Sequence, residues 1–126
     1  MAKGKFVWKT TATGHFRFNL IASNGQVIAT SENYNSKDSC LNGIESVRKD
    51  AGSGVEDQTV EGYEEISNPK YEMYLDKAGE FRFRLKARNG EIIAVGEGYK
   101  AKASCLNGIE SIKNHAPEAP VAEEEK

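Results

Sequence analysis

The sequence predicts an α+β domain in which two copies of one structural unit share a single hydrophobic core. The first observation is an internal repeat, because residues 39–46 recur unchanged as residues 104–111, an offset of 65 positions. At this offset, 21 of the 36 positions from 14 to 49 match their partners without a gap. The second observation is size. A unit of about 60 residues buries only about 60% of its unfolded surface, so two units with a common core are the more stable arrangement.

Alternation of apolar and polar residues predicts three strands at the start of each unit. In the first unit they cover residues 5–10, 16–23 and 26–31. The middle strand is the clearest, because one of its faces consists of Phe16, Phe18, Leu20 and Ala22. After it, Asn24-Gly25 predicts a two-residue type I′ hairpin, in which both central residues have positive φ. The three strands should form an antiparallel meander.

A helix should follow over residues 37–49. Ser36 is its predicted N-cap, because a serine hydroxyl accepts a hydrogen bond from the first helical amides. The side chains that fall on one side of this helix, and so face the sheet, are Cys40, Ile44 and Val47. Gly43 lies at the edge of this stripe. A glycine costs a helix about 1 kcal/mol relative to alanine, so Gly43 predicts a close approach of the helix backbone to another element.

The second unit repeats these elements as strands 71–75, 81–87 and 92–96, a turn at Asn89-Gly90 and a helix over 102–114. Ala101 replaces the serine cap, so this helix start should be weaker. Each helix is followed by a short segment with strand character, residues 55–59 and 119–122. We therefore expect one pseudo-symmetric domain over residues 1–126, with repeat one at 5–60, repeat two at 70–122 and an acidic, disordered tail at 123–126.

Several short motifs occur at matching places in both units. In repeat one they are Phe16-Arg-Phe-Asn-Leu, Asn24-Gly25, Glu32-x-Tyr34-x-Ser36-Lys37 and Gly43-Ile-Glu-Ser-Val. In repeat two they are Phe81-Arg-Phe-Arg-Leu, Asn89-Gly90, Glu97-x-Tyr99 and Gly108-Ile-Glu-Ser-Ile. With these motifs the chain resembles, over nearly its whole length, the YegP-like family of small bacterial proteins. The resemblance implies two β-β-β-α-β repeats that share one antiparallel sheet, with both helices on one face and the C-terminal strand of each repeat exchanged into the other. It implies no known activity, because the family is one of unknown function.

The net charge of −2 is unevenly distributed along the chain. The units are mildly basic, +3 over residues 1–50 and +2 over 71–115, whereas the segments after them are acidic, −4 over 51–70 and −3 over 116–126. No apolar run approaches the ~18 residues of a membrane span, and the first residues lack the apolar stretch of a secretory signal. We therefore expect a cytoplasmic, monomeric protein that does not associate with membranes.

Cys40 and Cys105 occupy equivalent helix positions, which favours two reduced, buried thiols that pack as small hydrophobic side chains. The sequence contains no C-x-x-C motif, and His15 and His115 do not correspond at the offset of 65. We therefore predict no bound metal and no cofactor.

An enzyme could use the strand-to-helix corner, where Glu32 and Tyr34 recur as Glu97 and Tyr99. A carboxylate and a phenol at one site can transfer protons, and a cleft that also held Arg17 would favour catalysis. The alternative is a tyrosine that packs at the corner beside a solvated glutamate. We prefer this alternative and predict no catalytic residues.

Four cations alternate along the second strand of repeat two, on the face that points away from the helix; they are Arg82, Arg84, Lys86 and Arg88. In this basic ladder, neighbouring cations would lie about 6.6 Å apart, a spacing suited to a phosphate backbone or an acidic peptide. Weak nucleic-acid binding is therefore an alternative function. An ordinary solvated face is the simpler explanation, and the acidic segments 56–65 and 118–125 could also cover the ladder.

The outer face of each helix carries the same polar stripe, with Glu45 or Glu110 beside it; the two stripes are Ser39, Asn42 and Ser46, and Ser104, Asn107 and Ser111. Core packing does not require identity at exposed positions, so the stripe is a candidate docking surface, although recent duplication also explains it. The function that we favour is therefore a small, non-catalytic binding module with a protein partner that the sequence does not name.

Overall fold

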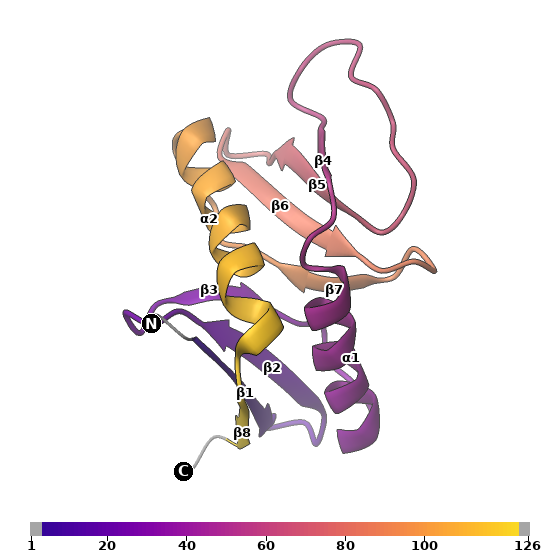
Figure 1. The fold of residues 1–126 in the computed structure, drawn as a ribbon, viewed down its shortest axis with the longest axis vertical. Helices are drawn as coiled ribbons and strands as arrows, with labels where there is room; N and C mark the ends of the chain where they lie inside the picture. Colours follow the sequence, from indigo (N-terminus) through magenta and orange to yellow (C-terminus); the bar gives the residue numbers. More distant parts are fainter. Residues whose placement is uncertain (1–3, 124–126) are drawn as a thin grey trace.

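The computed structural model describes residues 4–123 and shows one eight-stranded sheet with two helices on a single face (Figure 1). Repeat one contributes β1 (Lys5–Thr10), β2 (Phe16–Ile21), β3 (Val27–Thr30), α1 (Lys37–Asp50) and β4 (Val55–Asp57). Repeat two contributes β5 (Lys70–Leu75), β6 (Phe81–Lys86), β7 (Ile92–Val95), α2 (Lys102–His115), the short 3-10 helix η1 (Ala116–Glu118) and β8 (Val121–Glu123). The boundaries of the strands and of the two long helices fall within two residues of the predicted ones, whereas η1 was not predicted.

The strand order is β4-β5-β6-β7-β3-β2-β1-β8, so the last strand of each repeat lies beside the first strand of the other repeat. This confirms the expected exchange of C-terminal strands. The six central strands are antiparallel, whereas β4 pairs with β5 and β8 pairs with β1 in parallel. The sheet is therefore mixed and not purely antiparallel, because a strand that follows a helical crossover can pair in parallel.

The two repeats meet at the centre of the sheet through the pair Thr30 and Val95, which are 65 positions apart. The pseudo-twofold axis therefore passes through this pair. Each helix lies across the seam between the repeats, because α1 contacts β2 and β7 and α2 contacts β6 and β3. The helices thus cover both repeats and not only their own.

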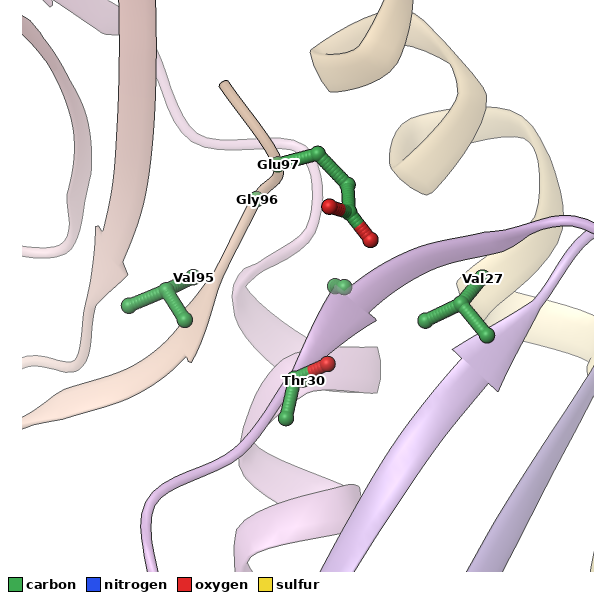
Figure 2. A pocket seen from close by; sticks show the side chains of 6 residues that line it. Val27, Thr30, Val95, Gly96 and Glu97 are labelled. Carbon is green, nitrogen blue, oxygen red and sulfur yellow. The ribbon is translucent and has the colours of Figure 1, made fainter. Parts of the chain in front are cut away.

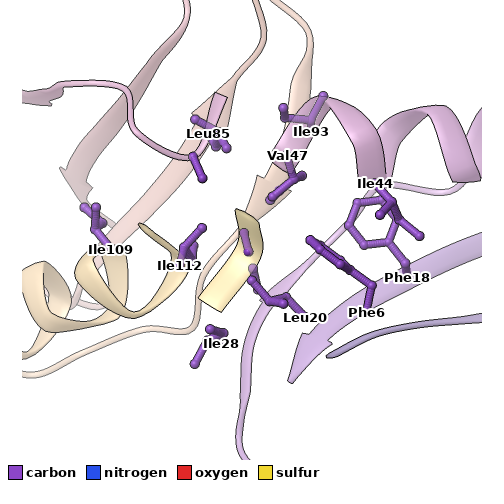
Figure 3. Close-up of a cluster of buried hydrophobic side chains, with 14 of the residues drawn as sticks. Phe6, Phe18, Leu20, Ile28, Ile44, Val47, Leu85, Ile93, Ile109 and Ile112 are labelled. Atoms are coloured by element: carbon purple, nitrogen blue, oxygen red, sulfur yellow. The ribbon is translucent and has the colours of Figure 1, made fainter. Parts of the chain in front are cut away.

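The core is one cluster of buried side chains from both repeats (Figure 3). The predicted periodicities are confirmed, because alternate residues of β2 and β6 and the sheet-facing side of each helix are buried; members of the cluster include Phe18, Leu20, Ile44, Val47, Leu85, Ile93, Ile109 and Ile112. Cys40 and Cys105 are fully buried in the same cluster, as expected. A shared core means that neither repeat buries its own apolar surface alone.

Hydrogen bonds between the repeats hold the exchanged strands in place. The backbone amide of Phe6 donates to the carbonyl of Pro120 at 2.8 Å, and the amide of Tyr71 donates to the carbonyl of Gly54 at 2.9 Å. The Tyr71 hydroxyl also donates to the carbonyl of Ala51, at the end of α1, at 2.7 Å. Burial raises the pKa of Tyr71, so this phenol keeps the proton that it donates.

The helix glycines allow a tyrosine to lie directly beneath each helix. A Cβ atom at Gly43 would lie 2.7 Å from Cζ of Tyr34 and 3.2 Å from Cε2 of Phe18. At Gly108, the corresponding distances to Tyr99 and Phe83 are 3.0 and 3.2 Å. This confirms the predicted close approach, because no residue with a side chain fits at this position without displacing the tyrosine ring.

The hairpin turns differ from the prediction. Gly25 has φ +89°, but Asn24 does not have positive φ, so the turn is not type I′. The amide of Ala22 donates to the carbonyl of Gln26, and the amide of Gly25 donates to the carbonyl of Ala22, which makes a three-residue loop with glycine in the left-handed position. The Asn24 side chain accepts a hydrogen bond from the Gln26 amide at 3.0 Å, an interaction that stabilises this turn.

The N-terminal caps of the two helices agree with the prediction from the sequence. Ser36 caps α1 by accepting a hydrogen bond from the Ser39 amide at 3.1 Å, whereas Ala101 gives α2 no side-chain cap. The assignment of Glu123 to a disordered tail was wrong, because this residue ends β8 and pairs with Trp8 of β1. The rest of that predicted tail, 124–126, lies outside the described residues.

We predict that chains cut near residue 60 give halves that do not persist as folded monomers. Each half loses the partner of its exchanged strand, since β4 pairs with β5 and β8 with β1. Size-exclusion chromatography with light scattering and amide NMR spectra of each half will test this. Mixing the halves should restore a dispersed spectrum, whereas a half that stays monomeric with dispersed amides would contradict the shared core.

We also predict that Gly43→Ala destabilises the protein by about 1–3 kcal/mol through overpacking against Tyr34, although alanine is the better helix former. Urea denaturation will measure the change. Gly52→Ala is the matched control, because no atom lies within 4 Å of a Cβ placed there. The Tyr34→Ala and Gly43→Ala changes together should cost less than their sum. A neutral Gly43→Ala variant would show that the close approach is not a constraint.

Candidate functional site

A surface groove runs between α1 and the hairpin that joins β6 to β7. It consists of three adjoining hollows of about 340, 320 and 460 Å³. The first two share Ser46, Ala87 and Asn89, and the last two share Tyr34, Glu91 and Ile93. One wall of the groove therefore comes from repeat one and the other from repeat two. Only the fold brings these two segments together.

The polar stripe of α1 forms the first wall of this groove. Ser39, Asn42 and Ser46 all line the middle hollow, facing Asn89 and Glu91 of the hairpin. The predicted docking residues of repeat one thus lie together in a concave surface. Of the hairpin residues only Arg88 was a predicted candidate, as part of the basic ladder, because nothing in the sequence relates residues 87–93 to the helix at 37–50.

The two ends of the groove carry opposite charges. Glu32 and Glu91 line one end, beside Tyr34. Lys49 and Arg88 line the other end, together with Asp50. A bound molecule with a cation at one end and an anion at the other would therefore meet complementary charges at both.

The matching stripe on α2 has different surroundings. Ser104 and Asn107 are exposed and Ser111 is half-buried, with its hydroxyl 3.2 Å from Nδ1 of His115. Three charged residues of the groove have uncharged equivalents in the other repeat. Arg88 corresponds to Ser23, Glu91 to Gln26, and Lys49 to Asn114. The two stripes are therefore identical, but the charges around them are not.

The groove does not bring together the residues of the hypothetical catalytic corner. Glu32 and Tyr34 share a hollow, but Arg17 does not line it. Tyr34 stacks on Phe18, with ring centroids 6.3 Å apart and an interplanar angle of 13°. Burial, followed by the nearby Cys40, Glu91 and Glu32, raises the pKa of Tyr34 to about 12. This phenol stays protonated at neutral pH and is a poor general base.

The basic ladder lies on the sheet face without helices, which we call the open face, but most of its charges are paired. Arg82 pairs with Asp76 at 2.6 Å, Arg84 pairs with Glu72 at 2.6 Å, and Lys86 lies 3.3 Å from Glu72. These carboxylates belong to β5 and the turn after it, and not to the acidic segments expected to cover the ladder. Arg88 lies beyond β6 and lines the groove instead. The ladder is therefore not a free cationic surface.

Buried carboxylates extend this network to the sheet edge. Lys70 lies 2.6 Å from Glu56 and 3.4 Å from Glu72. The hydrogen bond from Lys70 lowers the pKa of Glu56 to about 2 against the effect of burial. Burial also opposes ionisation of Glu72, but the hydrogen bonds and charges of Arg84 and Lys86 outweigh it and lower the pKa of this carboxyl. Both acids are ionised at neutral pH.

Other places in residues 4–123 offer less chemistry. The hollow at the seam between β3 and β7, into which Glu97 points, has a volume of about 100 Å³ (Figure 2). This is well below the ~300 Å³ of small ligand pockets. Burial raises the pKa of both cysteines to about 11, so the thiols stay protonated and unreactive. Over these residues we find no cluster of three metal-ligating side chains and no helix able to cross a membrane.

Comparison with known proteins shows to which family this chain belongs. The profile of a family described as Domain of unknown function (DUF1508) matches the chain twice, at residues 12–57 and 76–123. A relative from Stutzerimonas stutzeri, named UPF0339 protein in ptx operon 5'region, is 41% identical over 120 residues, which cover 95% of this chain and 96% of the relative. A UPF0339 protein from Treponema denticola is 63% identical over 54 residues, which cover 43% of this chain and 93% of the relative. That relative is therefore about as long as one repeat.

A solved structure shows the same fold. The solution NMR structure of yegP from E. coli, described as a protein of unknown function, has a TM-score of 0.80 at 33% identity and covers 98% of this chain and 94% of its own. Fold and sequence thus define a small α+β protein of two tandem repeats with exchanged edge strands. The chain belongs to the UPF0339, or YegP-like, family of unknown function, and the resemblance seen in the sequence is confirmed.

Proposed function

We propose that this protein is a non-catalytic binding module that holds an extended segment of a protein partner in the groove between α1 and the β6–β7 hairpin. The observation that carries the proposal is the position of the duplicated stripe. Ser39, Asn42 and Ser46 form one wall of a concave surface whose other wall belongs to the second repeat. Exposed side chains that serve only solubility need no such arrangement.

The chemistry of the groove suits a peptide better than a small metabolite. Its walls offer amide and hydroxyl groups that both donate and accept hydrogen bonds, as Asn42 does. Peptide backbone groups need both kinds of partner. The groove is shallow and elongated, which suits an extended segment with a basic side chain near Glu32 and Glu91 and an acidic one near Lys49 and Arg88.

The other candidate functions have less support. Catalysis at the strand-to-helix corner has less support because Arg17 does not line the hollow that holds Glu32 and Tyr34. The raised pKa of Tyr34 also makes this phenol a poor proton acceptor. Nucleic-acid binding through the basic ladder would need Arg82 and Arg84 to leave their carboxylate partners. The proposal retains the expectation, from the sequence, of a monomer in the cytoplasm.

A crosslinking experiment in cells tests the groove. A photoreactive phenylalanine replaces Asn42 in one variant and Asn107, the equivalent exposed residue of α2, in the matched control. Mass spectrometry identifies the crosslinked proteins. We expect a partner captured from position 42 and not from position 107, since the charged ends of the groove surround only the first.

The purified partner then permits a quantitative test. Asn42→Arg should weaken its affinity at least tenfold by filling the groove, whereas Asn107→Arg should change it less than twofold, as measured by isothermal titration calorimetry. Amide shift changes on binding should gather at residues 32–49 and 87–93. Equal effects of the two variants, or shift changes confined to another face, would reject the groove as the binding site.

A further inference from the structure

We propose that the open face of β1 and β2 is a second interaction surface, which binds an acidic, extended segment of a protein through Lys5, Lys9 and Arg17. This inference does not depend on the groove, because these three residues lie on the other side of the sheet. Phe6 and Trp8 of β1, like Phe18 of β2, are buried in the core beneath the helices. Alternation along a strand therefore directs the three cations to the open face.

Two of these cations oppose each other directly. Lys9 and Arg17 are cross-strand partners in the antiparallel pair of β1 and β2. Like charges at directly opposite positions destabilise a sheet. An anion, either within the chain or on a partner, would offset this destabilisation.

The second repeat shows what compensation within the chain looks like. Its equivalent of Arg17 is Arg82, which pairs with Asp76, and Glu72 in the neighbouring strand pairs with Arg84. Repeat one has Thr11 at the position of Asp76 and Val7 at the position of Glu72. Among residues 4–123, no carboxylate lies within ion-pair distance of Lys5, Lys9 or Arg17. The same backbone therefore carries paired cations in one repeat and unpaired cations in the other.

Arg17 gives a second, independent indication. Its Nε atom is inaccessible to solvent and has no hydrogen-bond partner among the described residues. A buried donor without an acceptor costs free energy, and a carboxylate is the acceptor that a guanidinium binds best. A carboxylate on this face would reach Nε only after the side chain moves to expose it, but beside the guanidinium it would directly offset the repulsion between Lys9 and Arg17.

The surroundings of the cations favour an acidic protein segment over nucleic acid. Binding of single strands relies on exposed aromatic rings that stack on bases. The aromatic side chains of β1 and β2 lie on the helix side of the sheet, whereas on the open face Val7 lies between Lys5 and Lys9, and Ile21 is the cross-strand partner of Lys5. Lys5 and Lys9 are four residues apart, or about 13 Å, which an extended peptide spans with carboxylates four positions apart. An aliphatic side chain midway between these carboxylates would lie over Val7, which is 9% exposed, and its cross-strand partner Asn19.

The test uses the full chain and the peptide Ac-Glu-Ser-Val-Ser-Glu-Ser-Val-Ser-Glu-NH2 as a probe, whose extended form has valines between glutamates four positions apart on one face. Titration is followed by amide NMR at ~20 mM salt, where screening is weak, and again at ~150 mM. We expect shift changes centred on residues 5–9 and 17–21, and an affinity that falls at the higher salt. Shift changes elsewhere, or an affinity independent of salt, would overturn the proposal without requiring any variant.

Matched variants use the internal symmetry of the chain. Arg17→Gln should weaken peptide binding at least fivefold and raise the midpoint of thermal unfolding, because it removes the repulsion with Lys9. The control Arg82→Gln should leave binding within twofold and lower the midpoint, because it breaks the pair with Asp76. A structural role for both arginines would instead lower the midpoint in both variants. Equal losses of binding in the two variants would contradict the proposal.

Two further titrations identify the anion source. An oligonucleotide of ten thymidines should bind at least tenfold more weakly than the peptide. Equal or tighter binding would show that nucleic acid is the preferred ligand and would overturn the proposal.

The second titration tests the chain's own acidic end. Glu124 and Glu125 lie outside the described residues, so the peptide titration is repeated with a chain that ends at Glu123. We expect an unchanged affinity. A tenfold increase would show that the chain's own acidic end occupies the cations, which would also overturn the proposal.

Discussion

The exchange of the C-terminal strands is the constraint on which the rest of the structure depends. Because β4 pairs with β5 and β8 pairs with β1, each helix must cross the seam between the repeats before its strand reaches the far edge of the sheet. This crossing places α1 against β7 of the other repeat and forms the single core. It also brings the stripe of α1 beside the β6–β7 hairpin, so the proposed groove exists only when the two repeats are joined.

Within this shared backbone the two repeats have diverged more in charge than in packing. Most core residues, the helix glycines and the corner tyrosines are the same in both repeats, and the exceptions include the pairs Phe6/Tyr71, Trp8/Met73 and Val47/Ile112. The open face differs, because an ion-pair network around Glu72 occupies repeat two, whereas in repeat one the cations Lys5, Lys9 and Arg17 form no ion pair within residues 4–123. Conserved packing with divergent surfaces is the pattern expected when one fold supports different contacts on its two halves.

Patterns within single segments were sufficient to predict the strands and helices. The groove and the ion pairs of the ladder depend instead on contacts between segments that are distant in sequence. Alternation along β2 and the spacing of Cys40, Ile44 and Val47 follow from geometry within one element, so the sequence was sufficient for them. The hairpin was assigned the wrong turn type because the Asn24 side chain bonds the Gln26 amide, and this favours a three-residue loop. The ladder looked free because its partner Glu72 lies 12 residues before Arg84, and only strand register places them together. The groove needs tertiary structure, since its walls are about 45 residues apart in sequence.

The central claim is that the exchanged strands join the two repeats into one cooperative unit. Native-state hydrogen exchange measures this in the intact chain, at amides bonded within each repeat and at amides bonded between them. The amides of Ser31 and Gly96, which donate to Phe18 and Phe83, report on repeats one and two, and those of Phe6 and Tyr71 report on the exchanged strands. The account predicts that Ser31 and Gly96 open with the same free energy, within about 1 kcal/mol, and that Phe6 and Tyr71 are protected with them. Separate opening energies for the two repeats, or unprotected amides at Phe6 and Tyr71, would contradict it.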